Sequence, residues 1–477
     1  MSERTDTTAI TTTTAITATD TLGDLRAAGH VQKSLRAEIR DNLLTALRDG
    51  RDPWPGLHGL ADTVIPQVER ALIAGHDIVL LGERGQGKTR LLRTLVGLLD
   101  EWTPVIAGSE LREHPFDPVT PGSRRRAAEL GDDLPVAWVH RDERYAEKLA
   151  TPDTSVGDLI GDVDPMKVAE GRSLGDPETI HYGLIPRSHR GIVAINELPD
   201  LAERIQVAML NVMEERDIQI RGYILRLPLD VLVVASANPE DYTNRGRIIT
   251  PLKDRFGAEI RTHYPVALDD EIAVIRQEAD LGTDPQAEVP DYLVEVLARF
   301  TRALRDSSSV DQRSGVSARF AIAGAETIAA AAVHRAARHG EDRPVARPVD
   351  LETAVDVLGG KVEFESGEED RADDILDHLL RTATAATARS LFRGIDLEPL
   401  VAALDGGTLI NTGEQMTAAD FLAGLPDSPG GLYGRIWERL DAVDDGQRAA
   451  ALEFALEALF LSRRIDKEIV GGDTVYG

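Results

Sequence analysis

Two kinds of hydrophobic spacing divide the chain. From Gly59 to about Pro265, short apolar runs alternate with stretches of helical spacing, a pattern typical of a parallel sheet covered by helices on both faces. We expect strands at Ile78–Leu81, Val136–His140, Ile192–Ile195, Val231–Ala235 and Glu259–His263. Beyond Leu268 the strand-like runs stop, and the spacing predicts helices over Leu268–Ala279, Tyr292–Arg305, Ser317–Ala337, Leu351–Leu358 and Gln447–Arg463.

These patterns predict five segments. The first is rich in Thr and Ala without a periodic apolar face, so we expect a disordered tail. The second is dominated by a helix from about Val31 to Leu47. An α/β domain, a helical lid and a helical C-terminal extension follow, the last beginning with the charged stretch Glu363–Asp374. The predicted boundaries are 1–23, 24–55, 56–266, 267–362 and 363–477.

Charge and composition exclude several classes of protein. The chain has 81 acidic and 53 basic residues, a formal charge of −28, and this field repels a phosphate backbone, so we expect no nucleic-acid partner. Cysteine is absent, which excludes disulfides, zinc–thiolate sites and cysteine nucleophiles. No apolar run approaches the roughly 20 residues that span a bilayer, and the N-terminus lacks a signal-peptide pattern. We therefore expect a cytoplasmic protein with no membrane partner.

The strongest chemical signal is a glycine-rich loop between a strand and a helix. Gly82-Glu-Arg-Gly-Gln-Gly-Lys-Thr89 matches the phosphate-loop pattern G-x-x-x-x-G-K-[ST]. Its glycines let successive N–H groups face phosphates, Lys88 neutralises them, and Thr89 offers a hydroxyl to Mg²⁺. The cofactors predicted are ATP and Mg²⁺. The predicted nucleotide-binding residues are Gly82, Glu83, Arg84, Gly85, Gln86, Gly87, Lys88, Thr89 and Arg90.

A second strand ends in polar residues that complete such a site. In Gly191-Ile-Val-Ala-Ile-Asn196-Glu197, Glu197 occupies the position of the acid that activates the attacking water. Asn196 stands where an Asp is expected, so Mg²⁺ loses one anionic neighbour although the amide oxygen still accepts hydrogen bonds from its waters. Two interpretations stay open: hydrolysis is retained, which we favour, or the site mainly senses nucleotide.

Three further residues follow in the order that a ring-forming ATPase requires. Asn238 ends another apolar strand and is suited to hold the lytic water or read the γ-phosphate. Arg255, in Pro251-Leu-Lys-Asp-Arg255-Phe256, is suited to reach a neighbouring subunit's γ-phosphate. Arg319, in Gly315-Val-Ser-Ala-Arg319, opens a long helix and offers another cation. Each alone is equally consistent with a turn or a surface ion pair, so their order carries the argument.

The order GERGQGKT, GIVAINE, ASANPED, LKDRFG and GVSAR resembles that of the ATPase subunit of magnesium chelatase and its AAA+ relatives, including the MoxR-type chaperones. Roughly residues 56–360 are covered. The family carries an insertion in its second helix and a hairpin before the sensor Asn, and Asp217–Pro228 alternates like a hairpin arm. The resemblance implies an AAA+ parallel sheet sandwiched by helices, an all-helical lid and a helical extension.

The same resemblance implies a hexameric homo-oligomeric ring with ATP at subunit interfaces, where Arg255 acts as arginine finger and Arg319 as second sensor. It also implies a partner with a von Willebrand A-type, metal-binding domain. The function expected is an ATPase that remodels a partner protein or loads metal into it. The alternative is a nucleotide-gated assembly scaffold with weak hydrolysis, which Asn196 favours.

Overall fold

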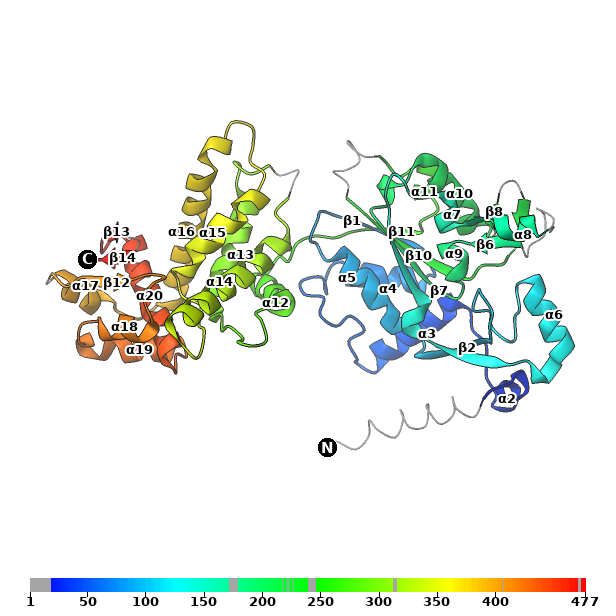
Figure 1. The fold of residues 1–477 in the computed structure, drawn as a ribbon, viewed down its shortest axis with the longest axis horizontal. Helices are drawn as coiled ribbons and strands as arrows, with labels where there is room; N and C mark the ends of the chain where they lie inside the picture. Colours follow the sequence, from blue (N-terminus) through cyan, green and yellow to red (C-terminus); the bar gives the residue numbers. More distant parts are fainter. Residues whose placement is uncertain are drawn as a thin grey trace. The chain divides into compact units, whose positions relative to one another are not determined.

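The computed structural model describes residues 19–170, 179–216, 218–220, 223–225, 227–238, 246–311, 315–405, 407–470 and 473–477. It divides into two compact units, Met1–His263 and Tyr264–Gly477, each with its own hydrophobic core. Figure 1 shows the sheet within the first unit and the helices of the second. Each unit is described by itself.

The N-terminal unit is built on a five-stranded parallel sheet in the order β11-β1-β10-β7-β4. Every residue of β1, β7 and β10 is buried, as expected for parallel strands with both faces covered. The prediction of an α/β sheet sandwiched by helices is therefore confirmed. The strands are β1 (Ile78–Leu81), β4 (Tyr145–Leu149), β7 (Gly191–Asn196), β10 (Val231–Ala237) and β11 (Ala258–Arg261).

Alternate residues of the central strands enter two different cores. Ile78 and Leu80 of β1 pack in one cluster and Val79 and Leu81 in the other, because successive side chains of a strand point to opposite faces. The first cluster includes helices α3 (Leu35–Arg48), α4 (Ile65–Ile73) and α5 (Lys88–Thr94) with the 3₁₀ turn η1 (Leu95–Leu98). The second includes α7 (Val156–Leu159), α9 (Leu184–Arg187), α10 (Glu203–Glu214) and α11 (Thr250–Lys253).

One predicted strand lies elsewhere. Val136–His140 does form a strand, β3, but it pairs antiparallel with β2 (Trp102–Ile106) outside the parallel sheet. Its expected place as a strand of that sheet is taken by β4, whose residues are partly exposed because β4 is an edge strand. Near this ribbon lie α2 (Leu22–Ala27) and α6 (Pro121–Leu130). The predicted disordered tail is wrong at its end, where Thr21 caps α2, and its residues 1–18 lie outside the described ones.

Two hairpins and a short helix accompany the sheet. β5 (Gly161–Val163) pairs antiparallel with β6 (Ile180–Tyr182), and α8 (Pro165–Ala169) lies between them in the chain. β8 (Ile218–Ile220) pairs antiparallel with β9 (Tyr223–Leu225). The hairpin predicted at this point of the chain is therefore confirmed, but Asp217–Pro228, expected to be one arm, contains both arms. Asp217, Arg221, Gly222 and Arg226 lie outside the described residues.

The C-terminal unit is mainly helical and has one core from Ile275 to Tyr476. The predicted C-terminal extension, expected to be helical, also contains a small sheet in the order β12-β14-β13. The predicted boundary between 362 and 363 falls inside the shared core. Its elements are α12 (Leu268–Glu278), α13 (Asp291–Asp306), α14 (Ala318–His339), α15 (Asp350–Leu358), α16 (Ala372–Leu391), α17 (Glu398–Asp405), β12 (Ile410–Thr412), α18 (Ala418–Ala423), α19 (Leu432–Arg439), α20 (Asp445–Leu461), β13 (Lys467–Val470) and β14 (Asp473–Tyr476).

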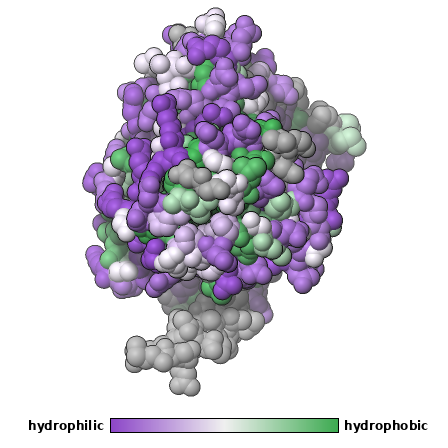
Figure 2. Space-filling view, turned by 90° about the vertical axis from the view of Figure 1, so that its left-hand side faces the viewer, coloured by the Kyte–Doolittle hydropathy of each residue, from purple (hydrophilic) through white to green (hydrophobic). Residues whose placement is uncertain are grey.

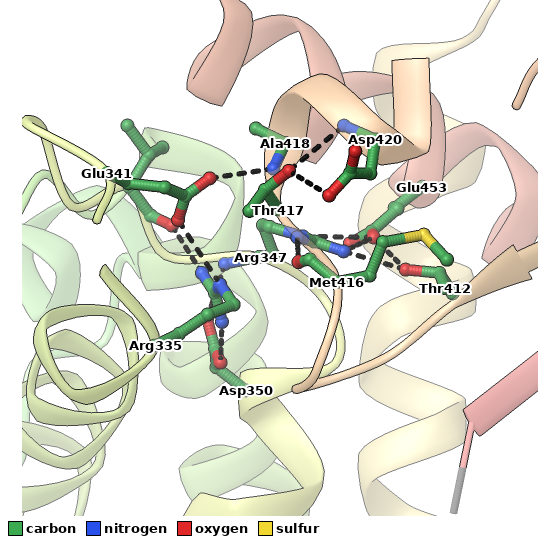
Figure 3. A network of polar contacts seen from close by, with 11 residues as sticks. Arg335, Glu341, Arg347, Asp350, Thr412, Met416, Thr417, Ala418, Asp420 and Glu453 are labelled. Carbon is green, nitrogen blue, oxygen red and sulfur yellow. Dashed lines mark hydrogen bonds and ion pairs between the residues drawn. The ribbon is translucent and has the colours of Figure 1, made fainter. Parts of the chain in front are cut away.

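A buried ionic network joins the predicted lid to the predicted extension (Figure 3). Arg347 is 1% exposed, donates to Glu453 through Nε at 3.0 Å, and donates to the Met416 carbonyl at 2.7 Å. Arg335 donates to Asp350 at 2.5 Å, and Asp350 in turn accepts from the Arg347 N–H at 2.7 Å. Because removing one partner would leave a buried charge unpaired, this network ties residues 335–350 to residues 412–453.

One face of the molecule is mainly hydrophilic. Figure 2 shows a face on which hydrophilic residues predominate and apolar residues form small separate groups. Among the helices in the part of the chain that the structure describes, none has the length and apolar character needed to cross a membrane.

Candidate nucleotide site

The loop between β1 and α5 has the backbone of an anion cradle. Gly85 and Gly87 adopt φ of +77° and +75°, a region that glycine enters without steric cost. Gly87 is the N-cap of α5, so the N–H groups of the first turn, which have no acceptor within the helix, face the loop. Side chains at these two glycines would strain the turn, which explains why the pattern requires Gly87 and why glycine also suits position 85, where the pattern allows any residue.

Gly82 is required for a different reason, which is lack of space. A Cβ built there would lie 2.0 Å from Thr262 Oγ1 and 2.2 Å from Gln86 Oε1. Gln86 Oε1 accepts from Thr262 Oγ1 at 2.8 Å and from the Glu83 N–H at 3.1 Å. Thr262 follows β11, so the neighbouring strand fixes the floor of the loop. Thr262 was not predicted, because nothing along the chain marks which residue after β11 contacts the loop.

Lys88 is 7% exposed and turns back on its own loop. Its Nζ donates to the Gly82 carbonyl and, at 2.6 Å, to the Glu83 carbonyl. A buried ammonium held over a cradle of backbone N–H groups is the donor set that phosphate oxygens require. The residues present therefore fit a nucleotide phosphate, and Thr89, next along α5, carries the hydroxyl suited to Mg²⁺.

The strand order brings the other predicted groups to the same edge of the sheet. Leu81 lies opposite Ala237 in the β1–β10 pairing, so Gly82 and Asn238 leave adjacent strands side by side. β10 also pairs with β7, which ends at Asn196 and leads into Glu197. The ends of β1 and β7 are two strand spacings apart, about 10 Å. The phosphate loop, Asn238 and Glu197 therefore share one edge.

Glu197 has an unusual backbone conformation. Its φ of +55° and ψ of +49° are left-handed, which is uncommon and costly for a residue other than glycine. Its N–H donates to Ser236 Oγ at 3.4 Å, and a 3₁₀ turn, η5 (Leu198–Asp200), begins immediately after it. A strained non-glycine residue at the end of a buried strand is typical of a functional position.

Asn196 is buried and uses both ends of its amide within the protein. Nδ2 donates to Glu147 Oε1 at 2.7 Å, and Oδ1 accepts from Ser236 Oγ at 3.0 Å. Glu147 lies on β4 and is also held by Arg93 of α5 at 2.8 Å. The Arg93 guanidinium lowers the pKa of Glu147 below its usual range, with hydrogen bonds from Tyr145 and Asn196 adding to the effect. Glu147 was missed because β4 was not predicted.

Arg255 lies at the opposite edge of the sheet from the phosphate loop of its own chain. It comes just before β11, whose first residue, Ala258, pairs with Ile78 at the amino end of β1. The phosphate loop begins at the other end of β1, roughly 13 Å along the strand. Within the chain, Arg255 Nε donates to Glu214 Oε2 at 2.9 Å and Nη1 donates to the Pro251 carbonyl at 2.9 Å.

Arg319 belongs to the C-terminal unit. It lies in the first turn of α14, where its N–H donates to Ser317 Oγ at 3.2 Å. Its place near the nucleotide therefore stays a prediction from the resemblance.

The fold and the arrangement at this edge define the class: the N-terminal unit is a P-loop α/β domain with a parallel sheet, followed by a mainly helical unit. The predicted resemblance to magnesium chelatase is confirmed by comparison with curated proteins. The chain is 26% identical over 228 residues to magnesium-chelatase subunit ChlI of Anabaena variabilis, covering 46% of this chain and 62% of that one. It is 26% identical over 226 residues to the chloroplastic subunit ChlI-1 of Arabidopsis thaliana, covering 46% and 49%.

The extent of these matches is limited. The aligned part spans between about half and three fifths of these relatives' length. No family profile matches the sequence. Among solved structures, a complex of subunits BchI and BchD of magnesium chelatase has a TM-score of 0.35 at 19% identity, covering 67% of this chain and 98% of that one.

Proposed function

We propose that this chain binds ATP with Mg²⁺ at the Gly82–Arg90 loop and hydrolyses it. The observation that carries the proposal is the shared sheet edge of the loop, Asn238 and Glu197. Lys88 and the loop N–H groups hold the β- and γ-phosphates. Thr89 and Asn196 are the residues proposed to hold Mg²⁺, directly or through water, and the metal would neutralise charge on the phosphates.

Glu197 is the proposed base. Its carboxylate takes a proton from the attacking water, whose oxygen forms the new bond to the γ-phosphorus while the bond to the β-bridging oxygen breaks. Asn238 orients that water or contacts the γ-phosphate. Glu147 adds negative charge to the site, because its carboxylate is hydrogen-bonded to the uncharged Asn196.

The proposal also includes a ring. Arg255 lies at the sheet edge opposite its own phosphate loop, so we propose that it serves the site of a second copy whose loop lies on that side. This is the arrangement of an arginine finger acting on a neighbouring subunit, for which a hexamer is the proposed assembly. From the resemblance of the sequence motifs to the magnesium-chelatase ATPase subunit, we also propose a partner with a von Willebrand A-type domain, which the ring would remodel or load with metal.

The test uses two substitutions with opposite signatures. Glu197→Gln is expected to keep ATP affinity and lose phosphate release, because the amide cannot take the proton. Lys88→Ala is expected to lose ATP binding itself. Equal turnover in Glu197→Gln and the unsubstituted protein would remove Glu197 from the mechanism, and unchanged ATP affinity in Lys88→Ala would remove the loop.

The second candidate function is a nucleotide-gated scaffold with weak hydrolysis. Asn196 favours it, because both amide ends are engaged by Glu147 and Ser236 and no carboxylate stands at that position. Steady-state phosphate release together with sedimentation separates the two. ATP-dependent assembly with negligible release, with or without partners, would support the scaffold.

A further inference from the structure

A second polar pocket lies at the edge of the sheet opposite the nucleotide site. We call it the amino-edge pocket. It has a volume of about 440 Å³, and its lining includes Lys33, Arg36, His114, His189, Arg190 and Arg216. Arg190 immediately precedes β7, and Asp230, also in the lining, immediately precedes β10. β7 is six residues long, so its length, roughly 20 Å, separates the pocket from the phosphate edge.

The ion pairs around this pocket leave out Arg190. Arg36 and Arg216 each donate to Asp77 at 2.9 Å, and Arg144 donates to Glu38 at 2.7 Å. Asp230 accepts from the Leu35 N–H at 2.7 Å and lies 4.0 Å from Arg36. Among the described residues, these carboxylates form ion pairs with three of the four guanidinium groups. Arg190 forms none, and Asp230, Glu38 and Asp117 act on it only from beyond ion-pair distance.

Arg190 is only 6% exposed. Its Nη2 donates to the Lys33 carbonyl at 3.2 Å, whereas its Nε is buried and has no hydrogen-bond partner in the part of the chain that the structure describes. At the exposed rim, Lys33 is paired with Asp41 and Asp117 adds one carboxylate, but solvent screens these charges. A buried guanidinium with an unused N–H is costly unless a counter-ion or an acceptor reaches it.

The two histidines offer no free acceptor, and only His189 adds a ring N–H to the pocket, because His114 Nε2 is hydrogen-bonded to His30 Nε2 at 3.1 Å. His189 Nδ1 accepts from the Asp230 N–H at 3.1 Å, and His114 Nδ1 accepts from the Phe116 N–H at 3.1 Å. Burial, with Arg190 as the next cause, lowers the pKa of His114 to about 3 and that of His189 to about 4. Both rings are therefore neutral at pH 7 with the proton on Nε2.

We propose that the amino-edge pocket binds a small oxyanion, a carboxylate or a phosphate, whose oxygens accept from Arg190. The Nε and Nη2 edge of a guanidinium is the fork that holds two oxygens of one such group. The site is distinct from the phosphate loop and needs no nucleotide chemistry, so it stands or falls independently of the proposed ATPase.

The experiment saturates the phosphate loop with ADP and Mg²⁺ and then titrates the full chain calorimetrically at constant ionic strength. The probes are inorganic phosphate in one arm and succinate in the other. Saturable binding of at least one probe is expected, and the tighter one identifies the oxyanion class. Absence of saturable binding for both would overturn the proposal.

Arg190→Gln is expected to weaken binding by about tenfold or more, since it removes a charged two-point contact. Arg48→Gln, a matched loss of an exposed arginine at the end of α3, is expected to change nothing, and Lys88→Ala without ADP is expected to retain binding. Equal affinity in Arg190→Gln would overturn the proposal.

If Arg190→Gln does not fold, histidine NMR of the unsubstituted protein tests the oxyanion site instead. Phosphate or succinate is expected to shift the ring signals of His114 and His189. If neither ring signal shifts at a saturating concentration of phosphate or succinate, the site is refuted.

Discussion

Asn196 Nδ2 and Glu147 Oε1 are 2.7 Å apart and share a hydrogen bond between neighbouring parallel strands. The amide thus stands where a carboxylate is usual in such sites and is bonded to a carboxylate one strand away. An Asp at this position would place two acids against each other, whereas the Asn connects Glu147 to Ser236. The carboxylate that is missing at Asn196 is therefore present on the neighbouring strand, as the side chain of Glu147.

This pairing predicts the outcome of Asn196→Asp. The substitution removes a donor and brings like charges into contact, so it should lower the free energy of unfolding by about 1–3 kcal/mol. Adding Glu147→Gln should recover most of that loss, because the new amide can donate to the introduced carboxylate and so restore the hydrogen bond in the reverse direction. Urea denaturation of both variants checks this. An Asn196→Asp variant as stable as the unsubstituted protein would contradict the pairing.

Gly82→Ala is expected to damage the phosphate loop. The added methyl would meet Thr262 Oγ1 and Gln86 Oε1 at 2.0 and 2.2 Å, so the loop must move at a cost of about 1–3 kcal/mol. We expect weaker ATP binding by calorimetry. Gly97→Ala is the matched control, because a Cβ there meets nothing within 4 Å. Equal effects of the two substitutions would contradict the steric explanation.

The sequence predicted the features that local patterns encode, and it missed those that depend on contacts between distant parts of the chain. The phosphate loop and the central strands are local patterns, so Ile78–Leu81 and the hairpin at β8 and β9 were predicted. Thr262 and Glu147 reach the site only through strand pairing, which no local pattern encodes. β3 was assigned to the parallel sheet because its alternation does not reveal its partner, and β12, β13 and β14 are too short to stand out against the helices.

The position of Arg255 predicts complementation between two inactive variants. Arg255→Ala and Glu197→Gln should each lower ATP turnover strongly, by about 10³-fold for the arginine. In a mixed assembly, an Arg255→Ala protomer contributes an intact Glu197 and a Glu197→Gln neighbour contributes an intact Arg255. Phosphate release should therefore reappear on mixing. Mixed assemblies as inactive as their components would mean that Arg255 does not act across an interface.

Acid should destabilise the N-terminal unit through His114 and His189. Both are buried and neutral, with pKa values of about 3 and about 4 against an ordinary 6.5. The unfolded chain takes up protons below pH 6.5 while the folded one does not. The stability contributed by each neutral ring is therefore complete above pH 6.5 and is lost as the pH falls towards its folded value. Between pH 6.5 and 5 the loss should be about 2 kcal/mol for each histidine.

Tryptophan fluorescence in a Trp437→Phe background isolates this unit, because the other tryptophans, Trp54, Trp102 and Trp138, all lie in it. His114→Gln should reduce the fall in unfolding free energy between pH 6.5 and 5 by about 2 kcal/mol, since glutamine keeps an acceptor for the Phe116 N–H but does not titrate. His189→Gln should reduce this fall by a similar amount, since glutamine likewise keeps an acceptor for the Asp230 N–H. If both variants lose as much stability in acid as the unsubstituted protein, the protons enter elsewhere and the two rings are not the acid-sensitive groups of this unit.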